Sequence, residues 1–437
     1  MRFRKGVAAL AAAIMSLTGL AACGTDSAQE EGKPDSISFW YYDTETSAQT
    51  KAWKKSAEQF TQQTGVKVKF EVKSFTQIAQ NSSQFLDSNQ APDIMESNRG
   101  NGSAGMLSAM HLLTDLTPYA KKYGWDKKVT EADASMAKYD DEGIMNGDKW
   151  YGLPSYAEYQ RVYYNVDMFK QYGIEVPKTM AEFESACQKF VDAGVTPIAA
   201  DAQEYGVMWL WWSLVGTKAN RALIDDWQMY KHDVNFKNKA LTYATNTINK
   251  WIKKGYISRN ATGLRAEDTT TSFIKGEYPI YQTGTWNQAR FIDQVKKFDW
   301  TAAALPGEKF LQGCTGNLIT IPEHSKHKDL AAQLLNNILS ESNQNDIGND
   351  GGVPMAADLS KITNEKNQEM IKEYSAFSEK GNLEYYPDYP ASNLTDAMSA
   401  EFQELVNGTK NPTQVLEGLE DAYTTGVVDM GFKDWEG

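Results

Sequence analysis

Residues 273–289 read Phe-Ile-Lys-Gly-Glu-Tyr-Pro-Ile-Tyr-Gln-Thr-Gly-Thr-Trp-Asn-Gln-Ala and carry the signals of a helix end, a short strand and a second helix start. Gly276 follows an apolar helical face and ends the first helix. The strand covers 278–282, with Pro279 near its start, where a missing N–H matters least. Gly284 then lets the backbone turn sharply before Trp286. This stretch predicts a tryptophan held where a strand passes into a helix.

The role of Trp286 has two interpretations. A flat indole beside a glycine turn can cover the face of a sugar ring, because tryptophan and tyrosine stack while forming hydrogen bonds at their edges. The chain holds 12 Trp and 22 Tyr, more than a core requires, which favours this interpretation. The alternative is that Trp286 is an ordinary core residue.

The motifs of this stretch continue further along the chain. Phe-x-x-Gly-x-x-Pro-Ile-x-x-x-Gly-x-Trp at 273–286 is followed by Leu-Pro-Gly at 305–307 and by Gly-Asn-Leu-Ile-Thr-Ile at 316–321. In order and spacing, these motifs resemble the extracellular solute-binding proteins of ABC importers, in the branch that includes the maltose-binding protein. The resemblance implies an α/β, periplasmic-binding-protein-like fold of two lobes, each a mostly parallel sheet flanked by helices, joined by a three-crossing hinge.

The resemblance also implies how the chain divides. We expect an N-terminal lobe made of 36–160 and 285–318, and a C-terminal lobe made of 161–284 and 319–437. The hinge is expected where the chain crosses between the lobes, near 158–162, 281–286 and 318–322.

The amino terminus has the pattern of a lipoprotein signal peptide. Residues 1–22 join three basic residues to an apolar run, and Leu-Ala-Ala-Cys at 20–23 resembles a lipobox. Cleavage before Cys23 and lipidation of its thiol follow from that box; the alternative is a plain signal peptide with an incidental cysteine. Residues 23–35 hold too few apolar side chains to fold and predict a flexible tether. We therefore expect an extracytoplasmic protein, lipid-anchored to the bacterial cell membrane through Cys23 only.

The charge and cysteine content limit the partners. The net charge is −13, and loss of the basic signal peptide makes the mature chain more acidic still. Such a chain should repel nucleic acid and anionic lipid headgroups. Cys187 and Cys314 could form a disulfide in an exported protein. However, Cys187 lies on an apolar helical face, which favours a buried free thiol.

The first lobe begins with alternating strands and helices. Strands are predicted at 36–41, 66–72 and 92–96, and helices at 46–65 and 76–89 lie between them. This order implies parallel strands with right-handed crossovers. Ligands bind such sheets at the carboxyl ends of the strands.

Polar side chains occupy those strand ends. Tyr42 and Asp43 follow the first strand, and Asn98 and Arg99 follow the third. Carboxylate, amide and guanidinium groups suit sugar hydroxyls because each forms two hydrogen bonds in a fixed plane. The glycine loop at 100–105 formally matches a dinucleotide fingerprint, but it does not follow the first strand and lacks a well-placed acid about 20 residues later. It is better interpreted as a loop that opens a helix beside the ligand cleft.

The resemblance assigns further ligand contacts to other segments. The first crossing carries Tyr156 and Glu158, and the loop after a late helix carries Gly351 and Gly352. An aromatic contact of the family falls near the Tyr-Pro-Asp-Tyr loop, which replaces the family's usual helical tryptophan; the residues that we assign there are Asp388 and Tyr389.

A cluster of tryptophans provides candidate platforms in the second lobe. Trp209, Trp211 and Trp212 cannot all face one side of a helix, so at least one should face the cleft. The family places an aromatic sugar platform in this part of the chain, and we take Trp209 and Trp211 as the candidates. The alternative is a fully buried helix.

No catalytic arrangement stands out. The sequence lacks Gly-x-Ser-x-Gly, His-Glu-x-x-His, a P-loop and Cys-x-x-Cys. His324 and His327 lie in a lysine-rich turn, which favours a solvated surface over a metal site. We therefore expect no cofactor and no metal. The sequence holds 57 carboxylates, and two of them could act as the acid and base of a glycosidase. A secreted glycoside-active enzyme therefore remains an alternative.

Together, these observations predict a monomeric, non-catalytic substrate-binding lipoprotein of an ABC sugar importer. It would capture an oligosaccharide between its lobes by aromatic stacking and hydrogen bonds, and deliver it to the permease subunits. A second alternative is a binding protein for another small solute, such as a polyamine or a metal chelate, since Tyr-Tyr pairs occur at 41–42, 163–164 and 385–386.

Overall fold

The computed structural model describes residues 33–431, and the elements below belong to one compact unit that begins at Asp35. The signal peptide and most of the tether predicted at 1–35 lie outside the described residues. None of the described helices combines the length and the apolar character that a membrane crossing requires.

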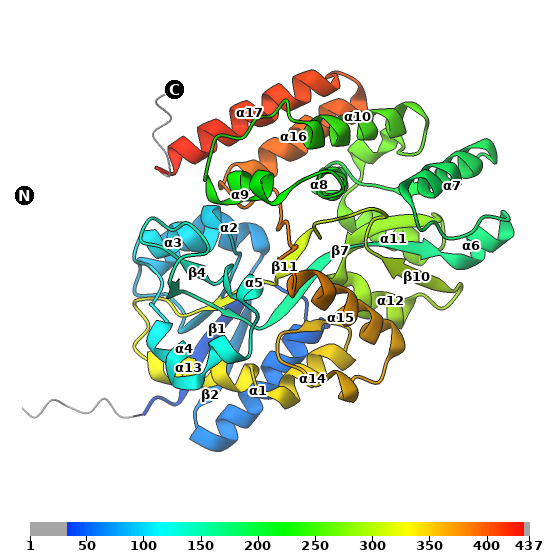
Figure 1. The fold of residues 1–437 in the computed structure, drawn as a ribbon. Coiled ribbons are helices and arrows are strands. Elements are labelled where there is room, and N and C mark those ends of the chain that lie inside the picture. The colour runs from blue at the N-terminus through cyan, green and yellow to red at the C-terminus, as the bar shows by residue number, and fades with distance from the viewer. Residues whose placement is uncertain (1–32, 432–437) are drawn as a thin grey trace, which may run out of the picture. The chain divides into compact units, whose positions relative to one another are not determined.

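The first sheet is built on strand β1, Ser36–Tyr41, near the blue end of the ribbon in Figure 1. Its alternate residues Ile37, Phe39 and Tyr41 are buried, as a strand with one face on a core requires. β1 runs parallel to both of its neighbours, whereas β12 pairs antiparallel with β3 and with β6. The order across this sheet is β2 (Lys67–Val72), β1, β3 (Ile94–Ser97), β12 (Leu318–Thr320) and β6 (Leu153–Pro154).

Helix α1, Ala48–Thr64, packs against this sheet through Trp53. The Trp53 indole stacks on Phe39 with 5.6 Å between ring centroids. The Ser47 side chain caps the first turn, and Gly65 ends the helix at φ 75°, a left-handed conformation that glycine adopts freely. The other elements of this region are α2 (Phe75–Leu86), α3 (Met106–Ala109), α4 (Thr117–Tyr123), α5 (Glu131–Ala134), β4 (Lys138–Tyr139), β5 (Lys149–Trp150), α13 (Lys328–Ile338) and α14 (Glu341–Asn349).

The second sheet is organised around the long strand β7, Tyr156–Asn165, in which all ten residues are buried. The first half of β7 pairs with β11 and β13, and its second half lies between β9 and β10. β7 therefore holds the strands of two regions together. Its partners are β9 (Ile280–Gly284), β10 (Trp300–Ala303), β11 (Gly313–Thr315) and β13 (Val353–Pro354), and β8 (Ile198–Ala199) extends the sheet beyond β9.

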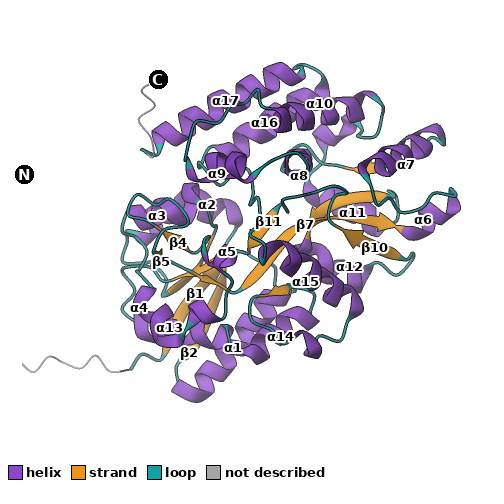
Figure 2. Cartoon of the chain, in the orientation of Figure 1, coloured by secondary structure: helices purple, strands orange, loops and turns teal. Residues whose placement is uncertain are grey.

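Ten helices among the described residues accompany the second sheet and the later part of the chain (Figure 2). In α8 and α10, which pack together, the apolar sides face one another. They are α6 (Val166–Gln171), α7 (Met180–Asp192), α8 (Gly206–Gly216), α9 (Arg221–Met229), α10 (Lys239–Lys253), α11 (Ala266–Ile274), α12 (Gln288–Gln294), α15 (Glu365–Ser378), α16 (Leu394–Asn407) and α17 (Pro412–Asp429).

The strand and helix order predicted for the start of the first lobe is confirmed, from β1 through α1, β2 and α2 to β3. The second sheet differs from the expected mostly parallel arrangement. β7 pairs antiparallel with β9, β10, β11 and β13, and only the β8–β9 pair is parallel. β7 is therefore the strand about which the antiparallel pairs of this sheet are arranged.

The strand pairing also differs from the expected division of the chain, which gave 285–318 to the N-terminal lobe and 319–437 to the C-terminal lobe. β10 pairs with β7 in the second sheet, whereas β12 lies between β3 and β6 in the first. α13 and α14 both pack on α1, beside the first sheet. β10 and the α13–α14 pair therefore lie with a different sheet than the expected division gave them, while the lobe bounds stay a prediction.

Two local expectations have clear outcomes. Cys187 and Cys314 are both buried and unbonded, which agrees with the free-thiol interpretation. Gly284 has φ −78°, so it does not make the sharp turn that the sequence suggested. Instead, a Cβ atom at Gly284 would lie 1.8 Å from the ring of Trp286, so the missing side chain makes room for the indole.

We predict that Gly284→Ala displaces the Trp286 ring and lowers the free energy of unfolding by about 1–3 kcal/mol, the usual cost of overpacking. Gly263→Ala is the matched control, since no atom lies within 4 Å of the Cβ it would add. Urea melts of both variants measure the difference. Equal stability of the two variants would contradict the close packing of Trp286 on Gly284.

Candidate functional site

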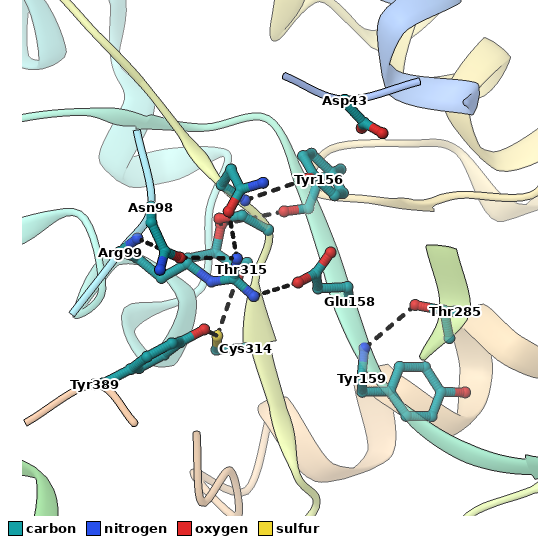
Figure 3. A network of polar contacts seen from close by, with 12 residues as sticks. Asp43, Asn98, Arg99, Tyr156, Glu158, Tyr159, Thr285, Cys314, Thr315 and Tyr389 are labelled. Atoms are coloured by element: carbon teal, nitrogen blue, oxygen red, sulfur yellow. Dashed lines mark hydrogen bonds and ion pairs between the residues drawn. The ribbon is translucent and has the colours of Figure 1, made fainter. Parts of the chain in front are cut away.

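Arg99, directly after β3, lies at the centre of a buried polar network (Figure 3). Its guanidinium forms an ion pair with Glu158 of β7 and donates a hydrogen bond to the side-chain oxygen of Asn317. The rings of Tyr386 and Tyr389 each lie 5.3 Å from its central carbon. Only 5% of Arg99 is exposed. Residues of both sheets and of the loop before α16 therefore contact the same guanidinium group.

Glu96, at the end of β3, ties the carboxyl end of β1 to this network. One of its oxygens accepts hydrogen bonds from the backbone N–H groups of Tyr42 at 2.9 Å and Asp43 at 3.1 Å. The other oxygen accepts a hydrogen bond from the Asn317 side-chain amide at 2.8 Å. Asn317 thus bridges Glu96 and Arg99, and the ends of β1 and β3 are fixed relative to each other.

Asp43 is the second carboxyl group at this edge. It accepts hydrogen bonds from the backbone N–H of Thr44 at 2.6 Å and from the side-chain amide of Gln49. Burial raises the pKa of Asp43 to about 6, and the charge of Glu158 contributes to that shift. Burial, and then the charge of Asp43, raise the pKa of Glu96 to about 8. Near neutral pH, the Asp43–Glu96 pair therefore retains part of its protons.

An aromatic cluster adjoins the network through Tyr386. Trp209 of α8 stacks on Tyr205 with 3.8 Å between ring centroids. The rings of Trp286 and Tyr386 pack against Trp209 at 5.4 Å and 5.2 Å. Three segments far apart in the sequence thus supply the flat faces that the sequence analysis expected near Trp209 and Trp286.

Trp211, the other predicted platform, lies elsewhere. It is fully buried, and its indole N–H donates to the Thr245 hydroxyl of α10 at 2.9 Å. Its ring packs on Trp212 and Phe402 in the helical core. The physical reason is helical spacing: residues two positions apart point to different sides of α8, so Trp209 and Trp211 cannot share one surface. Trp211 is therefore removed from the set of candidate contacts.

The network and the aromatic cluster border a narrow cavity, which we call the β7 cavity. Glu158, Gln49 and Trp286 contribute polar and aromatic groups to its wall, and Gly351 and Gly352 close one side. It encloses about 10 Å³, about the space that one water molecule needs. A larger ligand can enter only if the walls move apart. The full lining is Ala48, Gln49, Tyr156, Ala157, Glu158, Thr285, Trp286, Ala289, Gly351 and Gly352.

Most of the predicted site residues lie around this cavity or its network. The Tyr156 hydroxyl accepts a hydrogen bond from the backbone N–H of Asn317 at 3.3 Å, and Asn98 accepts one from the backbone N–H of Arg99 at 3.0 Å. Asp388 is held by the Thr395 hydroxyl at 2.9 Å, on the side of the aromatic cluster. The role of the predicted residues in ligand binding stays a prediction.

Sequence reasoning missed several residues of the network. Glu96 is the last residue of the strand predicted at 92–96, and Asn317 belongs to the motif at 316–321. Their positions at strand ends could therefore have identified both residues from the sequence. Tyr205 and Tyr386 carry no local signal, because only the tertiary fold brings them against Trp209.

The glycine loop at 100–105 provides a second contact between distant segments. The backbone N–H of Gly102 donates to the carbonyl of Tyr389 at 2.9 Å, and the Asn101 amide donates to the carbonyl of Gln228 at 2.8 Å. A Cβ at Gly100 would lie 2.6 Å from that of Tyr389. The glycines are therefore explained by the close approach of the loop that carries Tyr389, and no nucleotide role is needed.

A wider hollow of about 400 Å³ lies between α12, β10 and the start of α15. Its wall includes Trp300 and Lys366, whose ammonium lies 4.4 Å from the Trp300 ring centroid. Although this hollow is larger than the β7 cavity, no buried network of carboxylates among the described residues surrounds it. We place the candidate site at the β7 cavity, where four segments meet and Glu158 lies beside Tyr156 and Trp286. Within the described part of the chain, no group of three or more His, Cys, Asp or Glu could hold a metal ion.

With this geometry established, comparison with known proteins identifies the family. The chain belongs to the bacterial extracellular solute-binding proteins, whose family description matches residues 44–345. Over 209 residues it is 26% identical to a probable sugar-binding periplasmic protein of Mesorhizobium japonicum, a match that covers 47% of this chain and 45% of that one. The chain thus spans less than half the length of that relative.

Two longer matches cover nearly the whole chain. The maltodextrin-binding protein MdxE of Bacillus subtilis is 22% identical, with 96% of this chain and 99% of that one covered. The solved structure of a chitin oligosaccharide binding protein superposes with a TM-score of 0.75 at 18% identity, covering 90% of this chain and 99% of the other. These similarities establish the two-lobed, solute-binding-protein fold.

The raised pKa values of Asp43 and Glu96 predict how stability depends on pH. Because both folded-state pKa values exceed the ordinary ones, the folded protein binds more protons than the unfolded chain between about pH 4 and 8. The stabilising contribution is complete at the acid end of this range and is lost as the pH rises through about 8. Urea melts at pH 5, 6.5 and 8 should therefore show falling stability, and Glu96→Gln should reduce that fall. The exposed Glu58→Gln is the control; an unchanged slope in Glu96→Gln would contradict the shared titration.

Proposed function

We propose that this protein is the substrate-binding component of an ABC sugar importer and that it captures an oligosaccharide at the β7 cavity. The observation that carries the proposal is that Trp286 and Glu158 line one cavity, with Trp209 packed on Trp286 and Asp43 hydrogen-bonded to Gln49 of the same wall. Aromatic faces stack on sugar rings, while carboxylates accept hydrogen bonds from hydroxyls, so the two groups together suit a saccharide. The matched relatives are described as binding proteins for sugars or maltodextrin, which supports the ligand class.

Binding would require motion about β7. The cavity holds little more than one water, so the segments that carry Glu158, Trp286 and Gly351 must separate to admit a sugar ring and then close on it. Hinge closure of this kind relies on a few residues at the ends of elements. The closed, monomeric protein would then deliver its ligand to the permease subunits.

A catalytic role is not part of the proposal. Glu158 is paired with Arg99, and Glu96 accepts hydrogen bonds from three N–H groups, so both carboxylates are committed to structure. Incubation with xylo-, malto- and chito-oligosaccharides, followed by chromatography, tests this point. Release of shorter sugars would favour the glycoside-active enzyme instead.

Trp286→Ala tests the stacking role. A base stacked on an aromatic ring contributes about 1–3 kcal/mol, and a sugar ring should be similar, so Kd should rise roughly tenfold to hundredfold. Trp286 is only partly buried, and its loss should cost less folding stability than Trp211→Ala, for which about 3–5 kcal/mol is expected. Calorimetric titration with the best-bound oligosaccharide and urea melts on both variants separate the two effects. Normal binding by Trp286→Ala would contradict the platform role.

The proposed location is extracytoplasmic, with a lipid anchor on Cys23. The support is the lipobox at 20–23 and the polar segment that follows it. Cys23→Ser should leave sugar binding intact and move the protein from the membrane fraction to the soluble extracytoplasmic fraction. A Cys23→Ser protein that stays with the membrane after full processing would contradict the anchor.

A further inference from the structure

The balance of charge around the β7 cavity restricts the ligand further. Asp43, Glu96 and Glu158 act on one another electrostatically, and Glu158 adds to the charge felt by Asp43. Arg99 is the cation of this network, and it pairs with Glu158. Three carboxyl groups thus share one guanidinium.

Arg99 is committed to partners other than Asp43. Its guanidinium forms an ion pair with Glu158 and a hydrogen bond with Asn317. Tyr386 and Tyr389 lie against it as well. Among the described residues, no ion pair balances the negative charge that the Asp43–Glu96 pair keeps near neutral pH.

The wall of the cavity also has negative charge and no cationic side chain among the described residues that line it. Among the described residues that line it, Glu158 is the one charged side chain. One oxygen of Glu158 accepts from Arg99, and the carboxylate is drawn beside Tyr156 in Figure 3. Gln49, which also lines the wall, donates to Asp43 and so connects that carboxyl group to the cavity.

Removing charges from water without a partner is costly, whereas a cation brought in by the ligand would be paired at once. The neighbouring aromatic faces favour the same ligand, because the indole rings of Trp209 and Trp286 attract cations through their π-electrons. A neutral hydroxyl can also donate to a carboxylate, but it leaves the excess negative charge uncompensated.

We propose that the saccharide bound at the β7 cavity carries a protonated amine, as glucosamine-type oligosaccharides do, and that this amine pairs with Asp43 and Glu158. This inference rests on the proposed function and adds the chemical class of the ligand. The sugar ring stacks on the indole side, and the ammonium group faces the carboxylate side.

Calorimetric titrations of the full mature chain with matched ligands test the inference. The probes are the β-1,4-linked glucosamine disaccharide, its neutral N-acetylated form, cellobiose and spermidine, all in buffer with EDTA. The amine disaccharide should bind at least tenfold more tightly than both neutral disaccharides. Hydrogen bonds to charged groups are about twice as strong as neutral ones, which is the source of that preference.

Asp43→Asn should reduce the ratio of the neutral and cationic Kd values by about tenfold, because it removes a charge and keeps the side-chain shape. Asp141→Asn, which lies on an exposed loop with 77% of its side chain accessible, is the matched control and should leave the ratio unchanged. A thermal melt of each variant establishes that it is folded before titration.

The possible outcomes distinguish a failure of the amine inference from a failure of the proposed sugar-binding function. If the neutral disaccharides bind as tightly as the amine, or more tightly, the amine inference is wrong and sugar binding stands. If Asp43→Asn keeps the full preference, the pairing with Asp43 is wrong. If no saccharide binds, whether or not spermidine does, the proposed function itself fails.

Discussion

The buried ion pair between Arg99 and Glu158 is the interaction on which the rest of the site depends. A charge that is 95% removed from solvent must be paired, since leaving one partner alone would cost several kcal/mol. Asn317 and the two tyrosines complete its surroundings. The pair therefore fixes the end of β3, the strand β7 and the loop before α16 relative to one another.

β7 carries this constraint into the second sheet. Glu158 and Arg161 are three positions apart on one strand, so their side chains point to opposite faces. Arg161 pairs with Glu373 of α15 at 2.8 Å, and the Tyr159 hydroxyl donates to the same carboxylate at 2.7 Å. One face of β7 is thus tied to the ligand site and the other to α15. A movement of β7 that opens the cavity would act on both connections.

The sequence predicted the parts of this fold that local patterns control. The alternation of Ile37, Phe39 and Tyr41 identifies β1, and the position of Asp43 and Arg99 after strands places them at one sheet edge. Helical spacing could not decide between Trp209 and Trp211, because which side of α8 meets Trp286 depends on how α8 packs on α10.

Long-range pairing set the other limits of prediction. The assignment of 285–303 and 318–338 to the two sheets depends on β10 and β12, which are three or four residues long and carry little sequence signal. Gly284 was correctly singled out, but for the wrong physical reason: it accommodates the Trp286 ring rather than a turn. The contacts of Tyr386 could not be predicted from the sequence either, since only the fold brings its ring against both Arg99 and Trp209.

The most direct test of the account is a crystal structure of the protein with the oligosaccharide that binds best in titration. We expect a sugar ring against the indole of Trp286 or Trp209, with its polar substituents at Glu158 and Asp43 and the cavity widened around β7. A ligand bound instead in the hollow beside Trp300 and Lys366, with the β7 cavity unchanged, would contradict the account.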